Sequence, residues 1–193
     1  MRITELTPEL LGAWASLFEK SESACFCHYW HFEGTKNEWL ARCFQSPTDN
    51  RDDQTKRIVA RAPESRGLLA MEDEHAIGWM KLAPRALLPK LRRQGAYRSL
   101  DLGDDEGIWS IGCLLVRPDR RRHGVARALV KAAPDHVKAW GGTALEAYPH
   151  RVPHPQHDEE AWMGPESLYA ALVTERWQPI HDVPPYPVWR LTL

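Results

Sequence analysis

The sequence predicts a mixed α/β domain in which helices pack on the faces of one β-sheet. Short apolar runs typical of strands alternate along the chain with segments whose apolar residues recur at helical spacing. The 193 residues are about the length of one domain. Their composition, 43% apolar and 26% charged, excludes a disordered, collagenous or coiled-coil chain. We therefore expect a single domain over residues 1–193, with a sheet of six or seven strands.

The charge balance bears on possible partners, and the cysteine content indicates a protein of a reducing compartment. Lysine and arginine number 25 and aspartate and glutamate 26, a balance that gives no general attraction to nucleic acid or anionic membranes. The cysteines, at positions 25, 27, 43 and 113, are too few and too irregular for a secreted disulfide scaffold. No apolar run approaches the roughly 18 residues of a membrane span, and the N-terminus has no signal pattern. We expect a soluble cytoplasmic protein with neither nucleic acid nor membrane as partner.

The chain is predicted to open with a strand and a helix. The strand covers residues 2–6. Thr7 is expected to cap the helix that follows, because Pro8 suits its first position. The helix is expected to turn one apolar face inward, formed by Leu11, Trp14, Leu17 and Phe18.

Two further helices are expected before the next strand. The first covers residues 37–44, with Trp39, Leu40 and Cys43 facing inward, and the second covers residues 52–62. A polar break at 46–50 is expected to separate them. Residues 21–31 (SESACFCHYWH) have no periodicity, and we expect them to line a pocket or cross the sheet.

The centre of the chain is predicted to form a hairpin. Its strands are the apolar runs 67–72 and 76–82, joined by a tight polar connection. Residues 86–93 have helical spacing, and residues 99–107 read as an acidic loop.

A buried strand and a long helix are predicted next. Residues 108–116 (IWSIGCLLV) are almost continuously apolar, as in a central strand. Residues 124–140 have helical spacing, although Pro134 should kink or shorten that helix. Gly141 and Gly142 are expected to end it.

The remainder is predicted to contain three strands and one helix. A strand at 143–148 precedes a His- and Pro-rich loop at 149–160 and a helix at 166–175. Two closing strands are expected at 177–180 and 188–193, separated by prolines.

The segment with the strongest chemical signal is residues 116–129, VRPDRRRHGVARAL. A buried strand runs into a Pro-containing turn with several arginines and Gly124, and a helix follows at once. The N-terminus of a helix offers unpaired N–H groups and partial positive charge, which favour phosphate. The spacing matches neither the dinucleotide-binding nor the Walker pattern. We infer a site for a ligand that carries a pyrophosphate.

This segment resembles the GNAT superfamily of acetyl-CoA-dependent N-acetyltransferases. The central motif of that family, R/Q-x-x-G-x-G/A after a V-x-P strand end, stands here as Arg121-Arg122-His123-Gly124-Val125-Ala126 after Val116-Arg117-Pro118. The order of predicted elements is similar over most of the chain. The segments CFCHYW, GWMKLAPR, IWSIGCLLV and LEAYP also look like an uncharacterised bacterial branch of the family.

The resemblance implies where acetyl-CoA would bind. The backbone of Leu114, Leu115 and Val116 would pair with the pantetheine arm, and the amides of residues 122–126 would hold the pyrophosphate, with Arg121 adding charge. The acetyl group would lie where this strand and the strand at 143–148 splay apart. Gly112 is compatible with a bulge at that point.

The resemblance also implies two catalytic residues. Glu146 in LEAYP stands at the strand position where related ribosomal-protein acetyltransferases carry a base. Tyr169 in SLYAAL lies on the helix where many members carry a Tyr that protonates the departing thiolate. This chain lacks the Asn that usually follows the strand, and Arg176-Trp177 replaces the usual Gly-Phe about one turn late. These departures put the role of Tyr169 in question.

Each assignment has a structural alternative. The arginine-rich turn could be a solvated basic loop, Glu146 could pair with an arginine, and Tyr169 could pack in the core. The C-x-C-H-x-x-H pattern of Cys25, Cys27, His28 and His31 does not have zinc-site spacing, so we expect no metal there. We also expect His150, His154, His157 and Asp158 to form a surface loop or lid, and Cys113 to be a small buried apolar residue.

The sequence therefore predicts an acetyl-CoA-dependent N-acetyltransferase that acts by direct attack of a primary amine, without a metal. The acceptor would be a small molecule or a peptide. Two alternatives stay open: a catalytically silent acyl-CoA-binding regulatory module on the same fold, and an unrelated nucleotide- or phosphate-binding protein.

Overall fold

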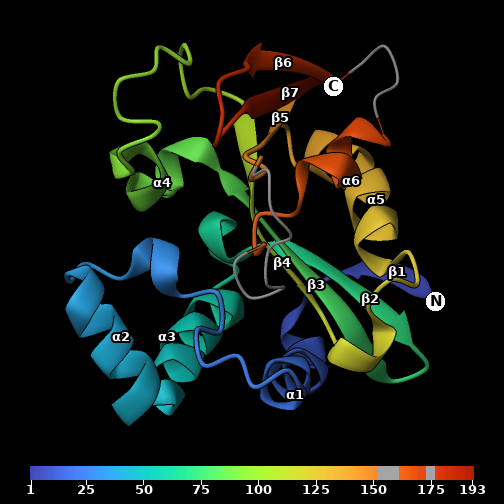
Figure 1. Ribbon diagram of the computed structural model, residues 1–193. Coiled ribbons are helices and arrows are strands. Elements are labelled where there is room, and N and C mark those ends of the chain that lie inside the picture. Colours follow the sequence, from blue (N-terminus) through green and yellow to red (C-terminus); the bar gives the residue numbers. More distant parts are fainter. Residues whose placement is uncertain (152–160, 173–176) are drawn as a thin grey trace.

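A computed structural model describes residues 1–151, 161–172 and 177–193. Within these residues seven strands form one mixed sheet in the order β1-β2-β3-β4-β5-β7-β6, which confirms the predicted fold class (Figure 1). The strands are β1 (Arg2–Glu5), β2 (Gly67–Glu72), β3 (His75–Pro84), β4 (Ile108–Val116), β5 (Ala144–Ala147), β6 (Trp177–His181) and β7 (Val188–Thr192).

Helices cover both faces of the sheet. They are α1 (Leu11–Lys20), α2 (Lys36–Gln45), α3 (Pro47–Val59), α4 (Pro89–Arg93), α5 (Val125–Ala139) and α6 (Glu166–Ala170), with short 3₁₀ turns at Pro8–Leu10, Tyr29–His31, Pro63–Ser65, Arg85–Leu87 and Pro118–Arg120. Figure 1 shows α5 and α6 together on one side and α1, α2 and α3 on the other. None of the helices in the described part of the chain is long and apolar enough to cross a membrane.

The core has one layer on each face of the sheet. On one face, Leu129 and Val137 of α5 pack with Met80 of β3. On the other face, Trp14 and Phe18 of α1 pack against the fully buried Trp79. The inward face predicted for α1 is thus confirmed for Trp14, Leu17 and Phe18, which are all buried.

The sheet divides along β4. This strand pairs with β3 as far as Val116, but its parallel pairing with β5 covers only Ile108 to Ser110. The two strands therefore splay apart beyond Ser110. The register between β3 and β4 also shifts at Gly112, where Lys81 pairs with Cys113 and Leu82 with Ile111. The bulge expected at Gly112 is present at the start of the splay.

Several local predictions were wrong. The side chain of Thr7 makes no capping hydrogen bond, because the chain enters α1 through the 3₁₀ turn Pro8–Leu10. Leu40 is 55% exposed, since the inward face of α2 is centred on Trp39. The expected polar break is the first turn of α3, because Pro47 fits the start of a helix.

The predictions for α5 and α6 had mixed outcomes. Pro134 does not shorten α5, whose buried residues Ala133 and Val137 hold the helix against the sheet as far as Ala139. Gly141 follows with φ +87°, in agreement with the predicted stop. The helix predicted at 166–175 ends at Ala170. Most of the predicted loop at 149–160 lies outside the described residues, as do residues 173–176.

Candidate active site

The arginine-rich turn lies between β4 and α5, as predicted. The chain leaves β4 through Pro118–Arg120 and enters α5 at Gly124, whose φ of +79° favours glycine. The first turn of α5 has no side-chain cap, and among the described residues, the chain neighbours of Gly124 apart, no atom lies within 4 Å of the place where its Cβ would stand. The amide groups at this helix start are therefore accessible to an anion.

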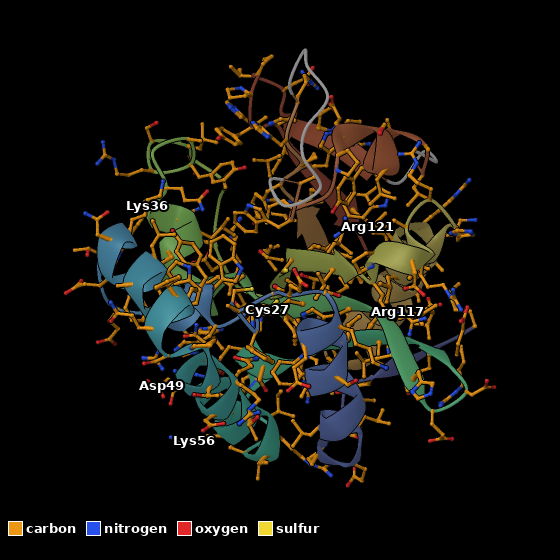
Figure 2. The ribbon with its side chains drawn as sticks, turned by 60° about the horizontal axis from the view of Figure 1, so that its bottom comes forward. Cys27, Lys36, Asp49, Lys56, Arg117 and Arg121 are labelled. Carbon is orange, nitrogen blue, oxygen red and sulfur yellow. The ribbon has the colours of Figure 1, made fainter. Side chains whose placement is uncertain are left out.

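Figure 2 shows Arg117 and Arg121 of this turn on the same side of the molecule. Arg122 and His123 are exposed, whereas Val125 is buried in the core, so only its backbone can serve a ligand. The Nε of Arg121 donates to the carbonyl of Val116 at 3.3 Å, which fixes Arg121 beside the end of β4. Arg117 pairs with Asp119, and Arg120 pairs with Glu72.

Beyond the splay, one edge of β4 faces away from β3. The N–H of Leu114 points to this edge, since it donates to the carbonyl of Trp162 at 2.7 Å. Backbone direction alternates along a strand, so the N–H of Val116 points the same way. This is the edge predicted to receive the pantetheine arm. Residues 161–164, which we call the strap, therefore contact β4 at the predicted cofactor site.

Tyr169 lies on α6, on the same face of the sheet as α5. It is fully buried, and its hydroxyl donates to the carbonyl of Met163 at 2.8 Å. Burial raises the pKa of Tyr169 well above its usual range, so the phenol keeps its proton at neutral pH. A residue that protonates a departing thiolate must itself carry a proton, and Tyr169 does. In this structure, however, its hydroxyl donates to a carbonyl of the strap.

Glu146 lies on β5, fully buried, on the opposite face of the sheet. Its Oε1 accepts hydrogen bonds from Arg85 at 3.0 Å and from the Nε and Nη2 of Arg190 at 2.9 and 2.5 Å. Its Oε2 accepts from the hydroxyl of Tyr148 at 2.5 Å. We call Glu146, Arg85, Arg190 and Tyr148 the Glu146 cluster. Both oxygens of the predicted base are thus occupied by protein partners.

Arg85 links this cluster to the loop before β4. Its side chain is fully buried, and it donates to the carbonyls of Leu102, Gly103 and Asp104 at 3.1, 2.8 and 2.6 Å. Its Nε also pairs with Asp105. Arg190 also donates to the carbonyl of Leu102, at 2.7 Å, so two arginines fix the acidic loop predicted at 99–107 over Glu146.

A line of hydroxyl groups connects Glu146 to β4. Tyr148 and Ser110 are both buried, and their hydroxyl oxygens are 2.9 Å apart. Ser110 is the last residue of β4 that pairs with β5, so this line ends at the splay. Burial, with Glu146 beside it, raises the pKa of Tyr148 well above its usual range. Tyr148 can therefore relay a proton but does not hold a negative charge at neutral pH.

The segment predicted to line a pocket lies against β4 at the bulge. The indole N–H of Trp30 donates to the carbonyl of Gly112 at 2.8 Å, and that of Trp79 contacts the Sγ of Cys27 at 3.0 Å. The fully buried Lys81 donates to the carbonyl of Glu64 at 2.7 Å, and burial lowers its pKa to about 8. This buried lysine was not predicted, because its sequence neighbours are those of an ordinary strand.

The cysteines and histidines of this segment differ in exposure: Cys27 and His28 are buried, whereas Cys25 and His31 are partly exposed. All four cysteines are free thiols, and Cys27 and Cys113 are buried. Burial lowers the pKa of His28 to about 4 and that of His31 to about 2. Among residues 1–151, 161–172 and 177–193, no group of three or more His, Cys, Asp or Glu side chains could hold a metal ion.

A polar cavity of about 630 Å³ lies behind this segment, between residues 28–34, α2 and α3. Its lining includes Arg42, Asp53 and Arg57 as well as Phe32. Figure 2 shows Lys56 of α3 on this side of the molecule, away from Arg117 and Arg121. The cavity and the arginine-rich turn are therefore separate.

Comparisons with known proteins agree with this architecture. The model of the acetyltransferase (GNAT) family matches residues 27–159, more than half of the chain. A search of curated protein sequences gave no match.

Several solved structures are similar over the whole chain. One is the PaiA N-acetyltransferase of Thermoplasma acidophilum in complex with coenzyme A, with a TM-score of 0.53, 12% identity and 100% of both chains covered. Another is the aminoglycoside 6'-N-acetyltransferase of Enterococcus faecium, with a TM-score of 0.56, 15% identity, and 100% of this chain and 97% of that chain covered. A third is the ribosomal-protein-alanine N-acetyltransferase of Brucella melitensis, with a TM-score of 0.55, 13% identity and 100% of both covered. At such low identity these three similarities show the fold alone.

Proposed function

The chain belongs to the acetyltransferase (GNAT) family, and from this premise we propose that it transfers the acetyl group of acetyl-CoA to a primary amine. The acceptor is a small molecule or a peptide, and its amine attacks the thioester directly. The whole chain acts as one N-acetyltransferase domain. We further propose that it works in the cytoplasm, a place that suits its four free thiols.

The observation that carries this proposal is the uncapped start of α5 beside the splay of β4 and β5. This helix start combines three features: backbone amides without a side-chain cap, a glycine with positive φ, and the exposed Arg122. Such a site suits the pyrophosphate of acetyl-CoA. The edge of β4 that is not paired with β5 leads from there toward the bulge at Gly112, a direction that suits an extended pantetheine arm.

Within this proposal the binding residues have distinct roles. The backbone of Leu114, Leu115 and Val116 holds the pantetheine arm. The amides of Arg122, His123, Gly124, Val125 and Ala126 hold the pyrophosphate, and the guanidinium groups of Arg121 and Arg122 add formal charge.

Two proton movements are needed, because the amine must lose a proton and the thiolate must gain one. Glu146 takes the first proton through the hydroxyls of Tyr148 and Ser110, since its own oxygens have protein partners. Tyr169 gives the second proton to the sulfur. The phenol carries its proton at neutral pH and so has one to give.

The test combines ligand binding with turnover. Acetyl-CoA and CoA should raise the melting temperature, whereas ATP should not. A ligand at 100 times its Kd adds about 2.7 kcal/mol to stability. Thiol release from acetyl-CoA should then appear with at least one member of a panel of polyamines, aminoglycosides, amino acids and peptides. A shift with ATP in place of CoA would support the nucleotide-binding alternative.

One specific observation favours the silent acyl-CoA-binding module as second candidate. Both predicted catalytic side chains already have protein partners, Glu146 in its ion cluster and Tyr169 on Met163. In that case CoA would bind with no thiol release for any amine. Thiol release by the wild type separates the candidates; where it occurs, an acid role for Tyr169 predicts a loss of about 10²-fold in kcat in Tyr169→Phe.

A further inference from the structure

The strap engages two groups that the proposed reaction needs. The carbonyl of Trp162 accepts the N–H of Leu114 at 2.7 Å, and the carbonyl of Met163 accepts the hydroxyl of Tyr169 at 2.8 Å. Leu114 belongs to β4 and Tyr169 to α6, so one short segment connects two separate elements. Two consecutive carbonyls of the strap therefore occupy an N–H of the predicted binding edge and the hydroxyl of the predicted acid.

Close packing holds the strap against β4. The indole of Trp162 packs on that of Trp30, with ring centroids 5.2 Å apart. The N–H of Gly164 donates to the carbonyl of Ala161 at 2.7 Å, which closes a turn. Gly164 has φ +81°, and a Cβ there would stand 3.0 Å from the Cδ1 of Leu114. Only glycine fits this approach without strain.

The strap and an extended ligand cannot share the edge of β4. A backbone N–H makes one good hydrogen bond, and a chain paired to a strand lies about 4.8 Å from it. While Trp162 accepts from Leu114, no pantetheine amide can do so. The same position of the strap keeps the Tyr169 hydroxyl on Met163 and away from any sulfur.

We propose that the strap is an internal competitor of the pantetheine arm, and that acetyl-CoA must displace it to bind. This inference rests on the proposed function. Because the two carbonyls are consecutive, the movement that frees the N–H of Leu114 also frees the hydroxyl of Tyr169. Binding of the acetyl donor and release of the acid are thereby one event. The donor's apparent affinity is lower than its intrinsic affinity by the fraction of molecules with the strap displaced.

The test measures CoA affinity by calorimetry in variants that loosen the strap from either end. Trp162→Ala removes the packing on Trp30, and Gly164→Ala introduces the clash with Leu114. Both should bind CoA more tightly than the wild type, by about 3- to 10-fold for Trp162→Ala. The matched control is Trp140→Ala, a half-buried tryptophan at the end of α5 that contacts Trp109 and Glu5, and it should leave CoA affinity unchanged.

A second measurement follows the strap directly. In protein labelled with fluorotryptophan, the ¹⁹F resonance of Trp162 is identified by its loss in Trp162→Phe. It should shift when CoA is added, while that of Trp140 should not.

Two results would overturn the strap proposal while the proposed function stands. One is CoA binding by the wild type with equal or weaker binding by both loosened variants. The other is CoA binding with an unmoved Trp162 resonance. Absence of CoA binding in the wild type and all variants would overturn the function and the strap together.

Discussion

Two groups of arginines in this protein lie in environments that differ in almost every respect. In the Glu146 cluster, Arg85 and Arg190 surround one carboxylate, and the side chain of Arg85 is fully buried. At the turn before α5, Arg122 and His123 are exposed around a helix start that has no side-chain cap. Charges in the first region bind each other, whereas the second region leaves positive potential for something else to bind.

This difference explains why the two regions should be tested in different ways. A buried ion cluster stabilises a fold only while it is complete, because removal of one member leaves an unpaired charge out of water. An exposed cationic turn contributes little to folding but can contribute to the binding of an anion. We therefore expect substitutions in the Glu146 cluster to change stability first and substitutions at the turn to change affinity first.

The largest effect is expected from Arg85→Ala. It removes one of the two cations beside Glu146 and the donor for three loop carbonyls. The free energy of unfolding should fall by about 3–5 kcal/mol. Urea denaturation measures it, with Arg122→Ala as the control, for which we expect a change within about 0.5 kcal/mol. Equal losses in the two variants would contradict the distinction between the regions.

Glu146→Gln should have the next largest effect and tests whether the cluster also takes part in catalysis. An amide offers one neutral oxygen to two guanidinium groups, so stability should fall by about 2–3 kcal/mol. If Glu146 is also the base, the acid limb of the pH–rate profile should move.

Tyr148→Phe is the matched control for that experiment. It interrupts the hydroxyl line between Glu146 and Ser110 and leaves both ion pairs in place. The relay predicts that kcat falls in this variant as well. Full kcat in both variants would leave the cluster with a structural role alone.

Gly124→Glu should reduce CoA affinity by about 20-fold, or roughly 2 kcal/mol. The substitution places a carboxylate where the pyrophosphate is proposed to bind. It also puts a residue other than glycine at a positive φ, which is unfavourable. Gly141→Glu is the control, because Gly141 also has positive φ and open space around it but lies at the other end of α5. CoA titration by calorimetry should separate the two; the same loss in both would indicate helix damage rather than a lost anion site.

Arg122→Ala should have the smallest effect, about a 3-fold loss of CoA affinity that shrinks as salt concentration rises. Lys138→Ala, an exposed cation at the last turn of α5, should show no such loss. Titrations at low and high salt compare them, and a salt-independent loss in Arg122→Ala would rule out a charge effect.

The sequence predicted the cationic turn because all its parts are adjacent. The strand end, Gly124 and the helix start follow one another within one segment, so spacing alone identified them. The Glu146 cluster could not be predicted in this way, because Arg85 and Arg190 are 61 and 44 residues from Glu146 in the chain. Nothing local distinguishes Arg85 from any other arginine after a strand.

The contact of the strap with β4 could not be predicted either, because its partners are also far apart in the sequence. Trp162 follows a His- and Pro-rich stretch, and its carbonyl contacts an amide 48 residues earlier, a backbone bond that no side-chain pattern encodes. The errors in the predicted bounds of single elements had local causes. Pro47 lies in a polar run that predicts a break, although proline is well suited to the first turn of a helix.

The position of β7 has a consequence for the order in which the protein is assembled. β7 follows β6 in the chain but lies between β5 and β6 in the sheet. During synthesis β6 emerges first and has no strand to pair with until residues 188–192 are made, because synthesis delivers the N-terminal parts first. Arg190 lies on β7, so Glu146 also lacks its second cation until then. Insertion of β7 therefore joins β6 to the sheet and brings the buried carboxylate its second cation in a single late step.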